Sequence, residues 1–132
     1  MKYLIILFTL VTFFSCKKDE ITECTKINYN QVFTATVGTT YCIDDNNSIV
    51  IDTVVNQLCP CNVVCVWEGE YSLRMSVTAD GKKYQYNLGT SLMTPDVQPF
   101  NDFIIEFLSI SPFTCDADIQ SNYRVELNLK RS

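Results

Sequence analysis

Three cysteines fall within seven residues at Cys59, Cys61 and Cys65, and the chain's only tryptophan, Trp67, follows two residues later. Cysteines this close together can do one of three kinds of chemistry. As thiolates they bind a structural metal, above all zinc. As a thiol pair with a lowered pKa they exchange disulfides, and as a closed disulfide they staple a small domain.

Zinc binding and redox exchange both lack features that they usually need. Structural zinc sites often recruit histidine, and the chain contains none. Reactive pairs have the spacing Cys-x-x-Cys at a helix N-terminus. The run Cys59-Pro60-Cys61 has one intervening residue instead, and no stretch of the chain has a sustained apolar period of 3.6 residues. We therefore expect disulfides here, with no metal and no cofactor.

Glu68 and Glu70 are the acidic pair nearest to these cysteines. In a strand, residues two apart share a face, and paired carboxylates can act as general acid and base. The absence of histidine removes the Ser-His and Cys-His nucleophile systems. Because a solvated strand edge is the commoner origin of such a pair, we predict that the protein is not an enzyme, with carboxylate-based hydrolysis as an alternative. Trp67, Glu68 and Glu70 remain candidate binding residues.

The N-terminal stretch MKYLIILFTLVTFFSC has one lysine and an unbroken apolar or threonine run from Tyr3 to Phe14. The run is shorter than the roughly 20 residues that span a bilayer, and it is typical of a secretory signal peptide. Ser15 directly before Cys16 resembles the lipobox of bacterial lipoproteins, in which the peptide is cleaved before the cysteine. The resemblance implies that Cys16 carries a diacylglycerol and becomes an acylated first residue.

Two further details resemble lipoproteins of the Bacteroidota. The aromatic pair Phe13-Phe14 is similar to lipobox variants of that group, and CKKDE is similar to its signal for export to the cell surface. Two or three acyl chains, at about 0.8 kcal/mol per buried CH₂, hold a protein in a membrane stably. We therefore expect a lipid anchor in the outer membrane, on its periplasmic face or at the cell surface. The expected organisation is a signal peptide over 1–15, a lipidated disordered tether over 16–30 and one β domain over 31–132.

The mature chain is acidic. Loss of Lys2 with the signal peptide leaves nine Lys plus Arg against fifteen Asp plus Glu, a net charge of 9 − 15 = −6. An acidic chain without a basic cluster is a poor ligand for nucleic acid or anionic headgroups. Its length suits one domain with a modest core, and we expect a monomer.

The elements that must position the cysteines are strands. Apolar residues alternate with polar ones along EYSLRMSVTAD and again along KKYQYNL, and Asp80-Gly81 between them suits a tight turn, so 70–88 is predicted to be a hairpin. Similar alternation occurs in QVFTATV, SIVIDTVV, FIIEFLSI and NYRVELNLK, and a short strand is expected at TTYCI before a turn at DDNN. The two prolines of TSLMTPDVQPFND predict a long loop there. The pattern predicts an all-β fold, a small antiparallel β-sandwich or sandwich-like barrel of six to eight strands.

With Cys16 assigned to lipid, six cysteines remain, an even number as a disulfide set requires: Cys24, Cys42, Cys59, Cys61, Cys65 and Cys115. Cys59 and Cys61 cannot easily bridge each other. A bridge from Cys59 to Cys65 would close a small loop, worth about 2 kcal/mol in the chain-entropy estimate.

The stretch CPCNVVCVWEGEYSLRM, with FIIEFLSISPF and NYRVELNL downstream, resembles a family of uncharacterised bacterial secreted proteins and lipoproteins. That family has Arg-Cys-Pro, then Cys-Val-Trp-Ala-Gly, and later a Ser-Pro turn and a closing strand. The resemblance implies that Cys59 pairs with Cys65 and that Trp67 packs behind the loop. It leaves Cys61 to pair with Cys24, Cys42 or Cys115. Leu58 stands where the family has arginine and Glu68 where it has alanine, and the family has no established activity.

The sequence thus predicts an acyl-anchored envelope lipoprotein with a binding or accessory role toward a protein or glycan partner. The alternative is an inhibitor of exported hydrolases, a protease or a lysozyme, that presents the stapled 59–65 loop.

Overall fold

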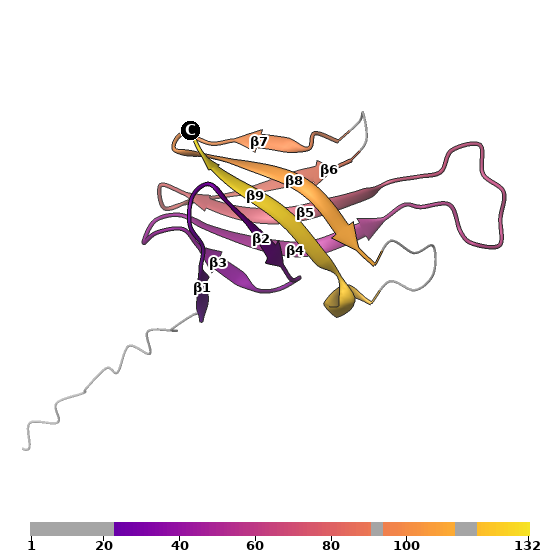
Figure 1. The fold of residues 1–132 in the computed structure, drawn as a ribbon, viewed down its shortest axis with the longest axis horizontal. Helices are drawn as coiled ribbons and strands as arrows, with labels where there is room; N and C mark the ends of the chain where they lie inside the picture. Colours follow the sequence, from indigo (N-terminus) through magenta and orange to yellow (C-terminus); the bar gives the residue numbers. More distant parts are fainter. Residues whose placement is uncertain (1–22, 91–93, 113–118) are drawn as a thin grey trace, which may run out of the picture.

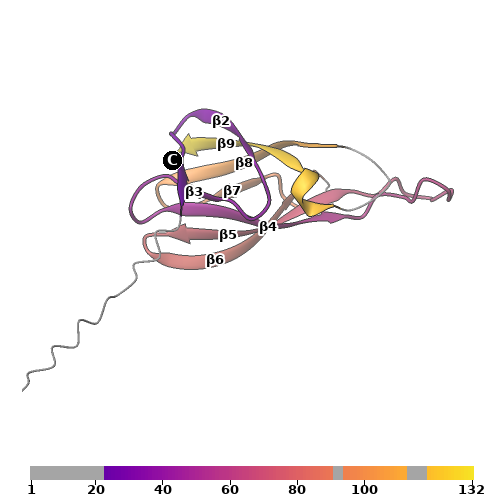
Figure 2. The ribbon, with the colours of Figure 1, turned by 90° about the horizontal axis from the view of Figure 1, so that it is seen from below.

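The structure is a computed structural model that describes residues 23–90, 94–112 and 119–132. The expected signal peptide, Cys16 and Cys115 lie outside the described residues. The fold is all-β, with two sheets that face each other as two layers (Figures 1 and 2). The prediction of a disulfide-stapled β-sandwich is confirmed.

The first sheet has five strands in the order β1-β3-β4-β5-β6, and the second has four in the order β2-β9-β8-β7. The strands span β1 Cys24–Lys26, β2 Gln31–Ala35, β3 Thr40–Cys42, β4 Ser48–Asn56, β5 Tyr71–Ala79, β6 Lys82–Gly89, β7 Val97–Pro99, β8 Phe103–Ser111 and β9 Arg124–Arg131, with a 3-10 turn η1 at Gln120–Asn122 before β9. Neighbours pair antiparallel, apart from β1 and β3, which run parallel.

The predicted hairpin over 70–88 is confirmed. Strands β5 and β6 pair from Ser72 opposite Gly89 to Ala79 opposite Lys82. Asp80 and Gly81 both have positive φ, as the tight turn between two twisted strands requires.

The core lies between the sheets and is built by the inward residues of each strand. Along β5 every second residue from Tyr71 to Ala79 is buried. In the opposite sheet, Tyr123 just before β9 and every second residue of β9 from Val125 to Leu129 are buried as well. The Tyr71 and Tyr123 rings meet edge to face with centroids 5.9 Å apart. Alternation in the sequence therefore placed the core correctly in both layers, because a strand buried on one face repeats every two residues.

The folded domain begins earlier than the sequence predicted. Cys24–Lys26 forms β1 beside β3, and Ile27 is buried in the core, although both lie in the stretch expected to be a disordered tether. The disulfide Cys24–Cys42, with Cα atoms 5.7 Å apart, fastens β1 to β3. A strand of three residues is too short to show an alternating pattern, so the covalent bond and the pairing decide its structure.

The loop expected over 90–102 also contains a short strand. Val97–Pro99 forms β7, which pairs with β8 at the edge of the second sheet. Pro99 lies at the end of that edge strand, where the missing N–H of proline costs no ladder hydrogen bond. The prolines did exclude a central strand, as predicted, but not an edge strand.

Candidate functional site

A long two-legged arm projects from one end of the sandwich, where β4 leaves the first sheet and β5 returns to it (Figures 1 and 2). The arm consists of residues 57–70 and contains all three closely spaced cysteines and Trp67. Strand β1 and the C-terminus lie at the other end of the molecule in both views. The arm is thus the part of the described structure farthest from where the chain enters the domain.

The base of the arm continues the β4–β5 ladder. After the last pair, Asn56 opposite Tyr71, the Gln57 N–H donates to the Glu70 carbonyl at 2.9 Å, and the Cys59 N–H donates to the Glu68 carbonyl at 2.9 Å. The Leu58 side chain packs against the core. The arm is therefore an ordered extension of the sheet at its base.

Gly69 is required where the outgoing segment 57–59 of the arm closely approaches the returning segment 68–70. Its φ is +85°, and a Cβ at this position would collide with the Gln57 carbonyl oxygen and lie 2.6 Å from the Leu58 Cα. Only glycine combines positive φ with such a close backbone approach at low cost. Gly69 therefore also breaks the alternation of side chains along this leg.

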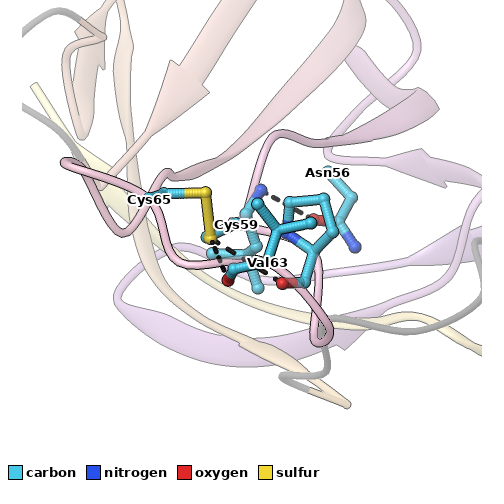
Figure 3. Close-up of a disulfide and its surroundings, with 6 residues drawn as sticks. Asn56, Cys59, Val63 and Cys65 are labelled. Carbon is cyan, nitrogen blue, oxygen red and sulfur yellow. Dashed lines mark hydrogen bonds between the residues drawn. A yellow bond between two sulfur atoms is a disulfide. The ribbon is translucent and has the colours of Figure 1, made fainter.

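The disulfide Cys59–Cys65 closes the outer part of the arm, with Cα atoms 5.9 Å apart (Figure 3). This is the pairing that the resemblance implied. Inside the closed loop, the Val63 N–H donates to the Pro60 carbonyl at 3.1 Å. The Cys59 sulfur lies 3.2 Å from the Val63 carbonyl oxygen; a bridged sulfur has no proton to donate, so this is a packing contact. The bridge thus closes residues 59–65 into a small loop.

The outer part of the arm exposes apolar side chains. Val64 and Val66 are fully exposed, Val63 is 54% exposed and Trp67 is 57% exposed. We call these four residues the arm tip. Other large exposed apolar residues of the described chain, such as Val32 and Leu108, lie singly on the strands, which is normal for a soluble surface. A cluster of four within five residues is the kind of patch that marks an interaction site.

The exposure of Trp67 limits the packing that the resemblance implied. The residue is 57% exposed, so the rest of the chain covers less than half of its surface. The arm extends beyond the strands of the second sheet in Figure 2, so none of the described strands forms an opposite layer over it.

The two acidic candidates are not brought together as expected. Glu68 is exposed on the arm, whereas Glu70 is only 8% exposed, at the arm base. The positive φ of Gly69 between them removes the geometry that would place both on one face. The Oε2 atom of Glu70 is buried and accepts no hydrogen bond from the residues that the structure describes. An exposed and a buried carboxylate on opposite sides of a glycine do not form an acid–base pair.

A glutamine side chain holds the arm base to the rest of the sandwich. The Gln120 Oε1 accepts from the Val54 N–H at 2.8 Å, and its Nε2 donates to the Val54 carbonyl at 3.0 Å. The Thr53 hydroxyl donates to the same Oε1 at 3.1 Å. The amide thus pairs with β4 as a strand would, and joins the η1 turn to the strand that leads into the arm. The hydrophobic pattern carried no signal for this contact.

Cys61, between the two stapled cysteines, is disulfide-bonded as well. Of its three expected partners, Cys24 and Cys42 are bonded to each other. The third, Cys115, lies outside the described residues. Sulfurs held in disulfides have no thiolate to offer a metal or a substrate.

A second candidate is a hollow of about 350 Å³ beside β1 and β3, lined by Cys24, Lys26, Cys42, Ile43, Asp44 and Asp45. The Asp44 carboxylate accepts from the Asn47 amide at 2.7 Å and from the Asn46 N–H at 2.8 Å. The hydrogen bond from the Asn47 side chain, together with those from the Asn46 and Asn47 backbone N–H groups, holds the pKa of Asp44 below its usual value. Asp44 therefore serves the turn predicted at DDNN, and among the described residues no three acidic or cysteine side chains converge as metal ligands.

Comparison of the chain with protein-family models, with curated proteins and with solved structures found no match. Within the described residues, no helix is long and apolar enough to cross a membrane. The arm tip is the candidate functional site on the basis of its geometry.

Proposed function

We propose that the protein is an acyl-anchored lipoprotein of the bacterial cell envelope that binds a partner through its arm, without catalysing a reaction. The observation that carries the proposal is the arm tip, an exposed apolar cluster on a stapled projection at one end of a compact domain. Burial of apolar surface is the main favourable term in most protein association, and an ordered loop loses little conformational entropy when it binds.

The position of the chain entry supports the same proposal. Acylation of Cys16 would attach the membrane through the tether that precedes β1, and β1 lies at the end opposite the arm (Figures 1 and 2). An anchor at that end would leave the arm tip free to reach away from the membrane. Attachment at the β1 end and binding at the arm end is the arrangement that a tethered binding module needs.

The anchor is tested by replacing Cys16 with Ser in cells that make the full chain. Metabolic labelling with palmitate and membrane fractionation are measured for both forms. The proposal expects a labelled chain in the membrane fraction, and an unlabelled chain released by Cys16→Ser. Equal membrane retention of both forms would remove the anchor from the proposal.

The binding role is tested by a photoreactive amino acid placed at position 64 in the arm tip. A matched position is Val32, an exposed valine on β2 away from the arm. Irradiation of intact cells should give a discrete covalent adduct with an envelope component from position 64 and none from position 32. No adduct from either position would contradict binding through the arm.

An inhibitor of exported hydrolases is the second candidate, because a projecting loop closed by the disulfide Cys59–Cys65 is shaped to enter a cleft. The test is a panel of serine, cysteine and metalloproteases and lysozymes, assayed with the purified domain. Inhibition that is lost when Val64 becomes Glu would support this function. A flat response across the panel would remove it.

A further inference from the structure

We infer that the arm tip docks into an apolar pocket with a basic rim on a protein partner. The inference rests on the proposed function and names the class of partner. Three properties of the described residues carry it: the composition of the arm tip, the charge around it and its rigidity.

The composition of the arm tip favours a protein pocket over a glycan. Its four side chains are three valines and one indole, all exposed. The Trp67 indole offers a sugar a stacking face, but the three valines offer neither that nor a hydrogen bond. Specific recognition of polar ligands needs several placed polar groups. Aliphatic side chains around a tryptophan suit an apolar pocket, in which a central aromatic anchor typically supplies most of the binding energy.

The charge around the arm tip disfavours a lipid surface. The arm, residues 57–70, has no Lys or Arg and two acidic residues, the exposed Glu68 and the buried Glu70. Loops and helices that insert into anionic membranes combine apolar residues with basic ones. Glu68 is exposed next to Trp67, so anionic headgroups would repel it. Lys or Arg side chains at the rim of a protein pocket would attract it and would speed association.

The rigidity of the arm fits insertion into a preformed pocket. The base is held by the Gln57–Glu70 and Cys59–Glu68 backbone hydrogen bonds, and the outer loop by the Cys59–Cys65 bridge. An element that is ordered before binding reaches high affinity with a small contact area, because little entropy is lost on docking.

A lipid target is tested first, since Trp67 is the only tryptophan and its fluorescence reports on the arm tip alone. The purified domain is titrated with vesicles of phosphatidylethanolamine and phosphatidylglycerol, and with vesicles of phosphatidylcholine. We expect the emission maximum to stay at the position of an exposed indole. A shift to shorter wavelength with either vesicle would overturn the inference in favour of membrane insertion.

The protein pocket is tested by mass spectrometry of the adduct formed in intact cells from the photoreactive residue at position 64. We expect the cross-linked peptide to come from a protein and to line an apolar pocket flanked by Lys or Arg in that protein's structure. An adduct with lipid or glycan, or with a flat polar surface, would overturn the inference while leaving an arm that binds.

Substitutions in the same labelled chain separate the two contributions. Val66→Asn should lower the adduct yield by about tenfold, because it brings a polar amide into the apolar pocket. Glu68→Lys should lower it more than Glu68→Gln, because the basic rim would repel the new charge. Val32→Asn is the matched control and should leave the yield unchanged. An increase with Glu68→Lys would contradict the basic rim, and an unchanged yield with Val66→Asn would contradict the pocket.

These outcomes are distinct from failure of the proposed function. If position 64 gives no adduct above position 32, binding through the arm itself fails. If it gives an adduct of the wrong chemistry, only the partner class fails.

Discussion

At the scale of single residues, Gly69 determines how the arm leaves the sandwich. Its positive φ and the adjacent Gln57 carbonyl leave no room for a side chain. Gly69→Ala should lower the free energy of unfolding by about 2 to 4 kcal/mol, from backbone strain and the forced separation of the two legs. Urea denaturation measures the change.

Gly38→Ala is the matched control for this prediction. Gly38 has a similar φ of +82°, but an added Cβ would meet no atom within 4 Å. Its substitution should cost about 1 kcal/mol, the price of the conformation alone. Equal losses for the two variants would show that the close approach to Gln57 is unimportant.

Glu70 is the second residue with a clear energetic consequence. A buried carboxyl oxygen without a hydrogen bond destabilises the folded state, because it gives up its hydrogen bonds to water. Because Oε2 accepts no hydrogen bond from the described residues, Glu70→Gln should raise the free energy of unfolding by about 1 kcal/mol. Glu68→Gln, at an exposed position, should change it little. Thermal melts of both variants check this, and a loss of stability with Glu70→Gln would contradict it.

At the scale of elements, the Gln120 amide substitutes for a strand at the arm base. Gln120→Ala removes two hydrogen bonds to Val54 and one from Thr53, and leaves buried backbone groups without partners. We expect a loss of about 2 to 3 kcal/mol. Amide hydrogen exchange at Val54 should accelerate far more than exchange at Val77 on the same sheet. Uniform acceleration would show global destabilisation instead of a local clamp.

The Cys59–Cys65 staple should order the arm without supporting the core. Replacing both cysteines with Ser should lower stability by about 2 kcal/mol at most, in the chain-entropy estimate. Since Trp67 lies just beyond the bridge, its fluorescence anisotropy should fall while the circular dichroism of the sheets is retained. Unchanged anisotropy would mean that the base hydrogen bonds together with the remaining Cys61 disulfide suffice to hold the arm.

The elements also show how far the sequence could be interpreted. Long strands were predictable because five alternate residues of β5 all face one core. Strands β1 and β7 were not, since three residues carry no period. Strand β3 is equally short and was predicted from the DDNN turn that follows it. The arm was predicted only as a stapled loop. Its projection depends on where the second sheet ends, a tertiary property that local sequence does not encode, and so the exposure of Trp67 was missed.

At the scale of the whole molecule, the cysteines form a covalent frame. All five cysteines of the described residues are disulfide-bonded. We therefore expect the purified tag-released domain to add no alkyl groups when treated with iodoacetamide under denaturing, non-reducing conditions, and six after reduction. Intact mass measures both. If two or more thiols react before reduction, the cysteines are not all bridged. Redox or metal chemistry would then again be a possible function of the arm.

The Cys24–Cys42 bridge has a mechanical consequence. If the chain is anchored through Cys16 as proposed, a partner that pulls on the arm tip would load β4 and β5 in the direction of the strands. The anchor would then resist through the chain entering at β1. Strand β1 pairs with β3 over only three residues, and such a short ladder would peel under tension. The disulfide transfers the load from the backbone of β1 directly to β3. Tension between membrane and partner would therefore pass along covalent bonds into the sheet that continues as the arm, and the tether could be pulled taut without unravelling the domain.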